Sequence, residues 1–146
     1  MNQETKTWKQ LVPGDKIWIV APVESDNAIS PNFQECSVIQ SKPIVNRYDN
    51  QVVYWFIKFK YTTPDGHRKR AYLNISMNLA DTVSVYRING KYGRSNMELG
   101  DVIAAVNPEY LKLKFNQLIV ERLVKNDMEI RKLEHTREML RKAYIK

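Results

Sequence analysis

The sequence predicts an α+β protein in which a small barrel of five or six strands is followed by one long C-terminal helix. Short runs rich in Val, Ile, Tyr, Phe and Trp alternate with turn residues over positions 1–106, which is typical of strands. Neither Gly nor Pro occurs after Pro108, so positions 107–146 can form a single helix. A chain of 146 residues is long enough for one domain with an appendage and for a core without disulfides. We therefore expect a barrel over 1–106 and a helix over 107–146.

The predicted strands are joined by residues that favour tight turns, with no helical segment between them, which favours a closed or half-closed barrel. Pro43 lacks a backbone N–H, so its strand is expected to be bent or to lie at an edge of the sheet. The predicted strands are residues 16–21, 36–47, 51–61, 70–75, 82–88 and 101–106. The predicted turns contain Asp49-Asn50, Pro64-Asp65-Gly66, Asn89-Gly90 and Gly100.

The start of the C-terminal helix is marked by three residues. Asn107 is a good N-cap, Pro108 suits the first helical position, and Glu109 favours the positive end of the helix dipole. The same letters, "NPEY", also spell an NPxY peptide signal. The helix-cap interpretation is favoured because a helical pattern of apolar residues begins directly afterwards.

Two segments, "LVPGDKIWIV" (11–20) and "MELGDVIAAV" (97–106), both place Gly-Asp before a short apolar run. They are a repeat, a pair of catalytic aspartates, or two turns of the same kind. Ten residues are too few for a structural repeat. A carboxylate dyad requires two side chains in contact, and no third catalytic group lies nearby. The favoured interpretation is two turns, each leading into a strand, because Gly tolerates positive φ and Asp bonds its own local backbone.

The segment "PGDKIWIV" (13–20) resembles the strand entry of SH3-like and KOW-type barrels, in which Gly-Asp precedes an alternating strand. This resemblance implies an SH3-like β-barrel. The later glycines of a KOW motif are missing after Val20, so ribosome or nucleic-acid binding is not implied by it. The whole chain also looks like small proteins of Bacteroides-infecting crAss-like phages, through "LVPGDKIWIV", a "TTPDGHRKR" hairpin and a basic C-terminal helix. That resemblance implies a phage virion component.

Residues that could carry out chemistry are few. Cys36, His67 and His135 are not spaced as metal ligands, and a lone cysteine in a strand is usually a core residue. No glycine-rich phosphate loop is present. We therefore expect no catalytic residue, no metal and no cofactor. The single cysteine, the polar first ten residues and the lack of a 20-residue apolar run predict a cytoplasmic location, or a virion if the source is a phage, without a membrane.

The hairpin over residues 51–75 predicts an anion-binding surface. A turn at Pro64-Asp65-Gly66 with Gly in the left-handed region pairs Lys60 with Arg70 and Lys58 with Tyr72. Like charges placed opposite each other destabilise a sheet unless an anion covers them, and DNA or RNA is a possible partner. The alternative is that these charges solubilise an exposed sheet face and protect its edge. The predicted anion or nucleic-acid site is Lys58, Lys60, Arg68, Lys69, Arg70 and Tyr72.

The two faces of this hairpin are expected to differ. The predicted core face is Val53, Trp55, Ile57, Phe59, Tyr61, Ala71, Leu73 and Ile75. The outer face begins with Val52, Tyr54 and Phe56, which we expect to be covered by the C-terminal helix, a second sheet or another chain. We expect Leu111, Phe115 and Leu118 to dock on them.

The C-terminal helix contains a heptad pattern. Six apolar residues recur at alternating steps of four and three once Asn126 and Arg137 are included in the stripe. A helix of about 40 residues is roughly 60 Å long, more than a small barrel can cover. We expect residues 128–146 to project and to associate with a partner protein or a second copy; the alternative is a break at Asn126-Asp127 and a return over the barrel. The predicted oligomerisation residues are Ile119, Leu123, Ile130, Leu133, Leu140 and Tyr144.

Two classes of function therefore follow from the sequence. The favoured one is a non-enzymatic structural or assembly protein, in which the barrel docks and the helix associates. The other is a small nucleic-acid-binding barrel that uses the basic face of the hairpin, in keeping with a net charge of +7.

Overall fold

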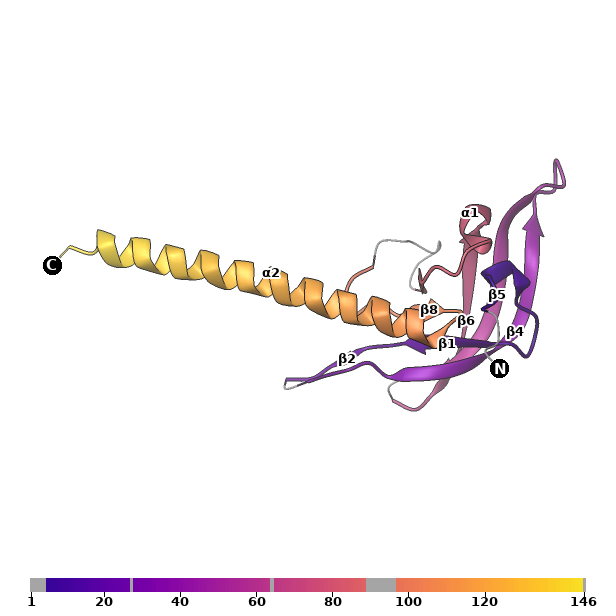
Figure 1. The fold of residues 1–146 in the computed structure, drawn as a ribbon, viewed down its shortest axis with the longest axis horizontal. Helices are drawn as coiled ribbons and strands as arrows, with labels where there is room; N and C mark the ends of the chain where they lie inside the picture. The colour runs from indigo at the N-terminus through magenta and orange to yellow at the C-terminus, as the bar shows by residue number, and fades with distance from the viewer. Residues whose placement is uncertain (1–4, 27, 64, 89–96, 146) are drawn as a thin grey trace.

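The computed structural model describes residues 5–26, 28–63, 65–88 and 97–145 and shows an α+β protein (Figure 1). A curled antiparallel sheet of six strands forms a half-barrel, and one long helix leaves it. The strand order is β6-β5-β4-β1-β8-β7, with β2 and β3 in a separate hairpin. The elements are η1 (Trp8–Gln10), β1 (Lys16–Val20), β2 (Val23–Glu24), β3 (Ile29–Ser30), β4 (Phe33–Val45), β5 (Val52–Thr62), β6 (Arg68–Ser76), α1 (Met77–Ala80), β7 (Tyr86–Arg87), β8 (Ile103–Ala105) and α2 (Pro108–Ala143).

The hairpin of β5 and β6 has the predicted register. Lys60 pairs with Arg70 and Lys58 with Tyr72. At the turn, the Thr63 N–H donates to the carbonyl of His67 (2.7 Å), and Gly66 has a φ of +89°. Pro64 lies outside the described residues. The predicted core face of the hairpin is confirmed except at Val53, whose side chain is exposed near the start of β5.

Pro43 lies where the sequence predicts, in a part of β4 that has a neighbour on one side. β1 pairs with β4 only at residues 33–37, while β5 continues along β4 to Val45. The pairing of β4 with β5 shifts between Val38 and Gln40, and again between Ile44 and Val45. These irregularities accompany the curl of the sheet, as bulges increase local twist.

The strand predicted over 82–88 is much shorter in the structure, where β7 has two residues. The reason lies in Trp8, which bonds to this segment. The Trp8 backbone N–H donates to the carbonyl of Thr82 (3.3 Å), and its indole N–H donates to the carbonyl of Ser84 (2.7 Å). The carbonyls of Thr82 and Ser84 therefore accept hydrogen bonds from Trp8 in the core in place of strand pairing. The turn predicted at Asn89-Gly90 lies outside the described residues.

The concave side of the half-barrel is filled by the largest core cluster. Trp8 is fully buried there, and its ring meets Tyr86 edge-on, with centroids 5.9 Å apart and planes at 85°. The cluster also takes in the inner residues of the four strands β1, β4, β5 and β6. The buried residues that these strands contribute include Ile17, Ile19, Cys36, Val38, Ile57, Phe59, Leu73 and Ile75.

The two Gly-Asp segments form matching turns, as the sequence predicts. The Asp15 carboxylate accepts a hydrogen bond from the Val12 N–H (2.9 Å), and the Asp101 carboxylate accepts one from the Glu98 N–H (2.8 Å). Gly14 and Gly100, which precede the two aspartates, have φ values of +94° and +111°. β1 and β8 are antiparallel neighbours, so the turns lie at opposite ends of the pair, roughly 20 Å apart. The two aspartates therefore do not form a catalytic dyad.

We expect Asp15→Ala and Asp101→Ala each to lower the free energy of unfolding by about 1 kcal/mol, because each removes a carboxylate that bonds a turn N–H. Their separation predicts that the double variant shows the sum of the two effects, within about 0.5 kcal/mol. Urea unfolding at neutral pH measures all three. A double variant that departs from additivity by more than that would show that the two turns are coupled.

The effect of Asp15→Ala is also expected to depend on pH. Burial raises the pKa of Asp15, but hydrogen bonds from the Lys6 ammonium and the Val12 N–H outweigh it and hold the pKa below 3.8. A lowered folded-state pKa stabilises the protein above the unfolded value, and this contribution disappears as the pH falls through the folded value. The difference between the parent and Asp15→Ala should therefore shrink below about pH 4. An unchanged difference at pH 3 would contradict this assignment.

Candidate functional sites

Helix α2 begins at the N-cap that the sequence predicts. The Asn107 side-chain oxygen accepts from the backbone N–H groups of Glu109 (2.8 Å) and Tyr110 (3.4 Å). The Asn107 amide also donates to the hydroxyl of Thr5 (2.9 Å), which ties the N-terminal segment to the start of the helix. The cap therefore fixes where α2 starts, two residues after β8 ends.

The first three turns of α2 pack on the outer face of β1 and β8, and not on β5. The predicted docking of Leu111, Phe115 and Leu118 on Val52, Tyr54 and Phe56 is wrong. The link between β8 and α2 is only two residues long, so the helix must begin beside β8, and β4 separates β1 from β5 in the sheet. The buried members of this second cluster are Val20, Leu99, Ile103, Ala105, Leu111 and Leu118, with Phe115 and Ile119 partly buried against them.

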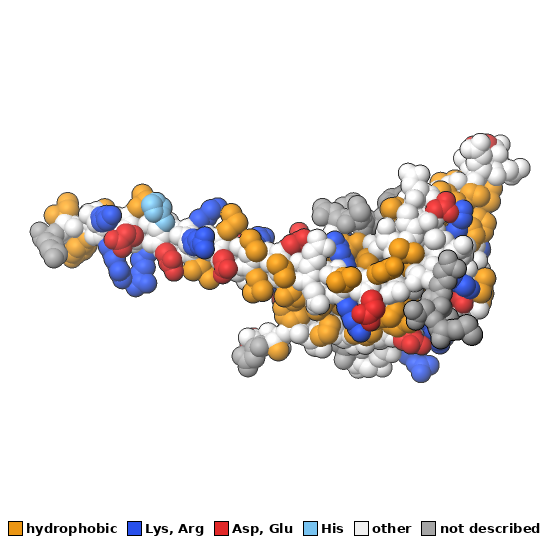
Figure 2. Space-filling model, viewed as in Figure 1, with side chains coloured by type: hydrophobic (Ala, Val, Ile, Leu, Met, Phe, Trp, Pro, Cys, Tyr) orange, Lys and Arg blue, Asp and Glu red, His pale blue; other side chains and the backbone are white. Residues whose placement is uncertain are grey.

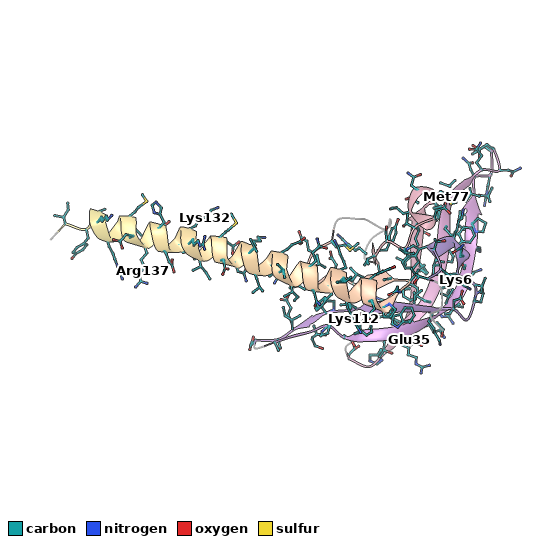
Figure 3. All side chains as sticks on the ribbon, in the orientation of Figure 1. Lys6, Glu35, Met77, Lys112, Lys132 and Arg137 are labelled. Atoms are coloured by element: carbon teal, nitrogen blue, oxygen red, sulfur yellow. The ribbon has the colours of Figure 1, made fainter. Side chains whose placement is uncertain are left out.

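Among the described residues, Arg122 is the last in α2 that forms a hydrogen bond or ion pair with the rest of the protein. Its guanidinium donates to the carbonyl of Leu99 (3.2 Å) and lies 3.4 Å from the Glu24 carboxylate on β2. Lys112, one of the side chains labelled in Figure 3, lies over the ring of Phe33, with its ammonium 5.4 Å from the ring centroid. These polar contacts surround the apolar dock and hold the helix in one direction relative to the sheet.

Beyond Arg122 the helix projects into solvent (Figures 1 and 2). It continues through Asn126 to Ala143 without a break, so the alternative of a break at Asn126-Asp127 and a return over the barrel is wrong. Residues 120–143, which we call the distal helix, extend about 36 Å at 1.5 Å per residue. The predicted projection is confirmed for the residues that the structure describes.

The six predicted oligomerisation residues differ in whether their own sheet covers them. Ile119 is half-buried against its own sheet. The other five form an exposed apolar stripe along the distal helix and its C-cap: Leu123 (57% exposed), Ile130 (52%), Leu133 (70%), Leu140 (67%) and Tyr144 (77%). A shallow groove on the same side is lined by Leu133, Thr136, Arg137, Leu140, Arg141 and Tyr144. Arg137 leaves the helix on the side away from Lys132 (Figure 3).

The outer face of β5 and β6 gathers most of the predicted anion site. Because side chains alternate along a strand, Lys58, Lys60, Arg68, Arg70 and Tyr72 share this surface, which we call the basic sheet face. Lys69, the sixth predicted residue, pairs with Tyr61 and therefore lies on the opposite face of the sheet, apart from the other five.

Two residues of this surface were not predicted as part of the site. Phe56 stacks on Tyr72, with ring centroids 5.8 Å apart and planes at 27°, and the Lys42 ammonium lies 5.7 Å from the Phe56 ring centroid. Phe56 was expected to lie beneath the helix, and Lys42 reaches it because it pairs with Phe56 across β4 and β5. The pairing of β4 with β5 depends on a register shift between Val38 and Gln40, for which the sequence holds no clear signal.

The three residues considered for catalysis, Cys36, His67 and His135, lie on different elements. Cys36 is buried in the core, and burial, with a smaller effect of the nearby Glu35 carboxylate, raises the pKa of its thiol to about 11. A thiol with such a pKa is protonated at neutral pH and is a poor nucleophile. His67 lies on the exposed hairpin turn, and His135 on the distal helix. Over 5–26, 28–63, 65–88 and 97–145, no three His, Cys, Asp or Glu side chains are grouped as a metal site.

Among the helices in the described part of the chain, none combines the length and apolar character needed to cross a membrane. The chain matches no protein-family model, no curated protein and no solved structure.

Proposed function

We propose that this protein is a non-enzymatic assembly protein, in which the half-barrel is the base and the distal helix is the arm that associates. One observation carries the proposal. The apolar stripe lies beyond Arg122, the last described residue of α2 that bonds to the rest of the protein, and each of its five members is more than half exposed. The proposal explains why the chain keeps an apolar seam on a helix segment that its own sheet does not cover.

The energetics of an isolated helix support the same proposal. The described helix residues beyond Arg122 lack the packing of an apolar face against the sheet, which supplies most helical stability in proteins. Exposed apolar residues gathered on one side of a helix also commonly mark an interaction site. A partner that covers the stripe stabilises the helix and removes this surface from water.

The proposal also covers the type of barrel and the biological setting of the protein. We assign the half-barrel to the SH3-like barrels, on the strand entry at 13–20 and its Gly14-Asp15 turn. We also propose a phage virion as the setting, on the resemblance to small proteins of crAss-like phages. The location is then the virion, and otherwise the cytoplasm.

Replacing Ile130 and Leu133 together by Asp should abolish association, since both side chains leave the apolar stripe and two charges enter it. We expect the parent to exceed its monomer mass of 17.2 kDa as concentration rises, and the variant to stay monomeric. Light scattering over a concentration series measures both. The half-barrel of the variant should still unfold cooperatively.

A matched control is the replacement of Met128 and Met139 by Asp. Both methionines are 58% exposed, close to the exposure of Ile130, but they lie on the other side of the helix. The control adds the same charge at similar exposure and should associate like the parent. A parent that is monomeric at every concentration, or a control that dissociates equally, would refute the proposed role of the stripe.

A second candidate function is nucleic-acid binding on the basic sheet face. The stacked pair Phe56 and Tyr72, with Lys42 beside it, is the specific observation that favours it. Nucleic-acid binders combine aromatic platforms, on which bases stack, with cations that contact phosphates. Lys60 opposite Arg70 places two cations on neighbouring strands of the same surface, a costly arrangement that an anion relieves.

Replacing Lys58, Lys60 and Arg70 together by Glu should then eliminate DNA or RNA binding. Each phosphate contact contributes about 0.9 to the slope of log K against log salt for duplex DNA, so the parent slope should be about 3 or more. The matched control replaces Lys125, Lys132 and Lys142 by Glu, which changes the net charge equally on exposed positions outside the stripe. Equal loss in both variants, or no binding by the parent at low salt, would exclude the basic sheet face as a specific site.

A further inference from the structure

We infer that the partner of the distal helix is a second copy of this chain, packed antiparallel, with Asn126 of each copy opposite Arg137 of the other. The inference rests on the proposed function, in which the distal helix associates, and it specifies the partner and its register. It is carried by the spacing of the seam, the positions of its two polar residues and the exposure of the stripe.

The spacing of the seam is the same from either end. Starting at Ile119, its eight positions follow steps of 4, 3, 4, 3, 4, 3 and 4 residues, so a reversed copy lays the same steps alongside. Every apolar residue then lies opposite an apolar residue, and the two polar residues lie opposite each other. The exposed pairs, each made twice in a dimer, are Leu123 with Leu140, Asn126 with Arg137, and Ile130 with Leu133. Tyr144 lies opposite the half-buried Ile119 at each end.

A parallel pair in register is much less favourable. It places the two Arg137 side chains beside each other at the seam, where two like charges repel in a partly dry environment. It also places Asn126 beside Asn126 and leaves both guanidinium groups without an acceptor from the seam. The antiparallel pair gives each Arg137 guanidinium the amide oxygen of Asn126 as an acceptor, so this donor is not left unpaired when the seam is buried.

The charges that flank the polar layer place one like-charge pair in this arrangement, with Arg137 beside it. Asp127 follows Asn126, and Glu134 lies three residues before Arg137, one helical turn away on the same helix face. In the antiparallel pair Asp127 faces Glu134 of the second copy, and their like charges repel. Arg137 of that copy lies next to both carboxylates, so its positive charge offsets the repulsion. Arg137 is therefore suited to a place in this seam despite its charge.

The shape and length of the distal helix also suit a second copy. The groove lined by Leu133, Arg137 and Leu140 receives the opposing residues Leu123, Asn126 and Ile130 of the second copy. The overlap from Ile119 to Tyr144 is about 38 Å long and ends where the helix reaches its own sheet. A strip about 38 Å long and about 10 Å wide is smaller than the roughly 800 Å² per partner of a standard stable interface. The association is therefore expected to depend on concentration.

Cysteine cross-linking between two separately tagged copies tests the register. One copy carries Leu123→Cys and the other Leu140→Cys, both on exposed positions of the distal helix, and a short bismaleimide reagent is added. We expect a cross-linked pair when the two are mixed and none with either alone, because two thiols introduced at position 123 would lie about 25 Å apart along the antiparallel helices. The unsubstituted chain is the control, since its buried Cys36 thiol, with a pKa raised to about 11, is protonated at neutral pH.

A second pair, Val120→Cys and Arg141→Cys, leaves the whole seam intact and lies beside it in the same register. It should also cross-link only when mixed, which guards against a loss of association caused by the Leu substitutions. Cross-linking of Leu123→Cys with itself would show a parallel pair and overturn the inference, while the proposed function stands. Association by light scattering without a cross-link in either mixture would overturn the inference in favour of another surface or partner. A parent that is monomeric by light scattering would overturn the proposed function itself.

Discussion

The packing of the first three turns of α2 on β1 and β8 determines which part of the helix is left exposed. Leu111 and Leu118 lie fully within a cluster that includes Val20 and Ile103, and the helix starts only two residues after β8. A link this short requires the helix to begin beside β8, and its apolar residues pack on the outer face of β1 and β8. Because α2 has 36 residues and the sheet covers only its first third, the remainder must project. The exposed stripe therefore follows from the length of the helix and the point at which it is anchored.

The N-terminal segment also holds the docked start of α2, and it reaches the opposite side of the sheet. Trp8 fills the concave core and bonds to Ser84, while Thr5 accepts a hydrogen bond from the helix N-cap Asn107. Lys6 forms an ion pair with Asp15, in the turn before β1 (2.8 Å). Residues 5–8 thus connect the inner core, the first strand entry and the start of α2. The half-barrel and the base of the helix are therefore expected to respond as one unit to changes in this segment, which suits a rigid base for a projecting arm.

The sequence predicted those parts of the fold that depend on local chemistry. Gly66 indicated the register of the β5–β6 hairpin, Asn107 the start of α2, and the Gly-Asp pairs the two matching turns, because each signal acts within a few residues. Contacts between distant segments were predicted less well. The helix docks on β1 and β8 because of strand order, which local patterns do not encode, and Trp8 enters the core from a polar segment without a periodic pattern. Lys69 was included in the predicted anion site, although the alternation of its own strand assigns it to the face opposite the other five residues.

Association through the apolar stripe should stabilise the distal helix. Hydrogen exchange measured by mass spectrometry at low and high protein concentration tests it most directly, since an unpartnered segment of this length is only marginally helical. Amides over residues 126–140 should exchange rapidly in dilute solution and become protected as concentration rises, whereas those over 111–118 should be protected throughout by the sheet. Equal protection of residues 126–140 at all concentrations would contradict the account, because the distal helix would then be stable without a partner.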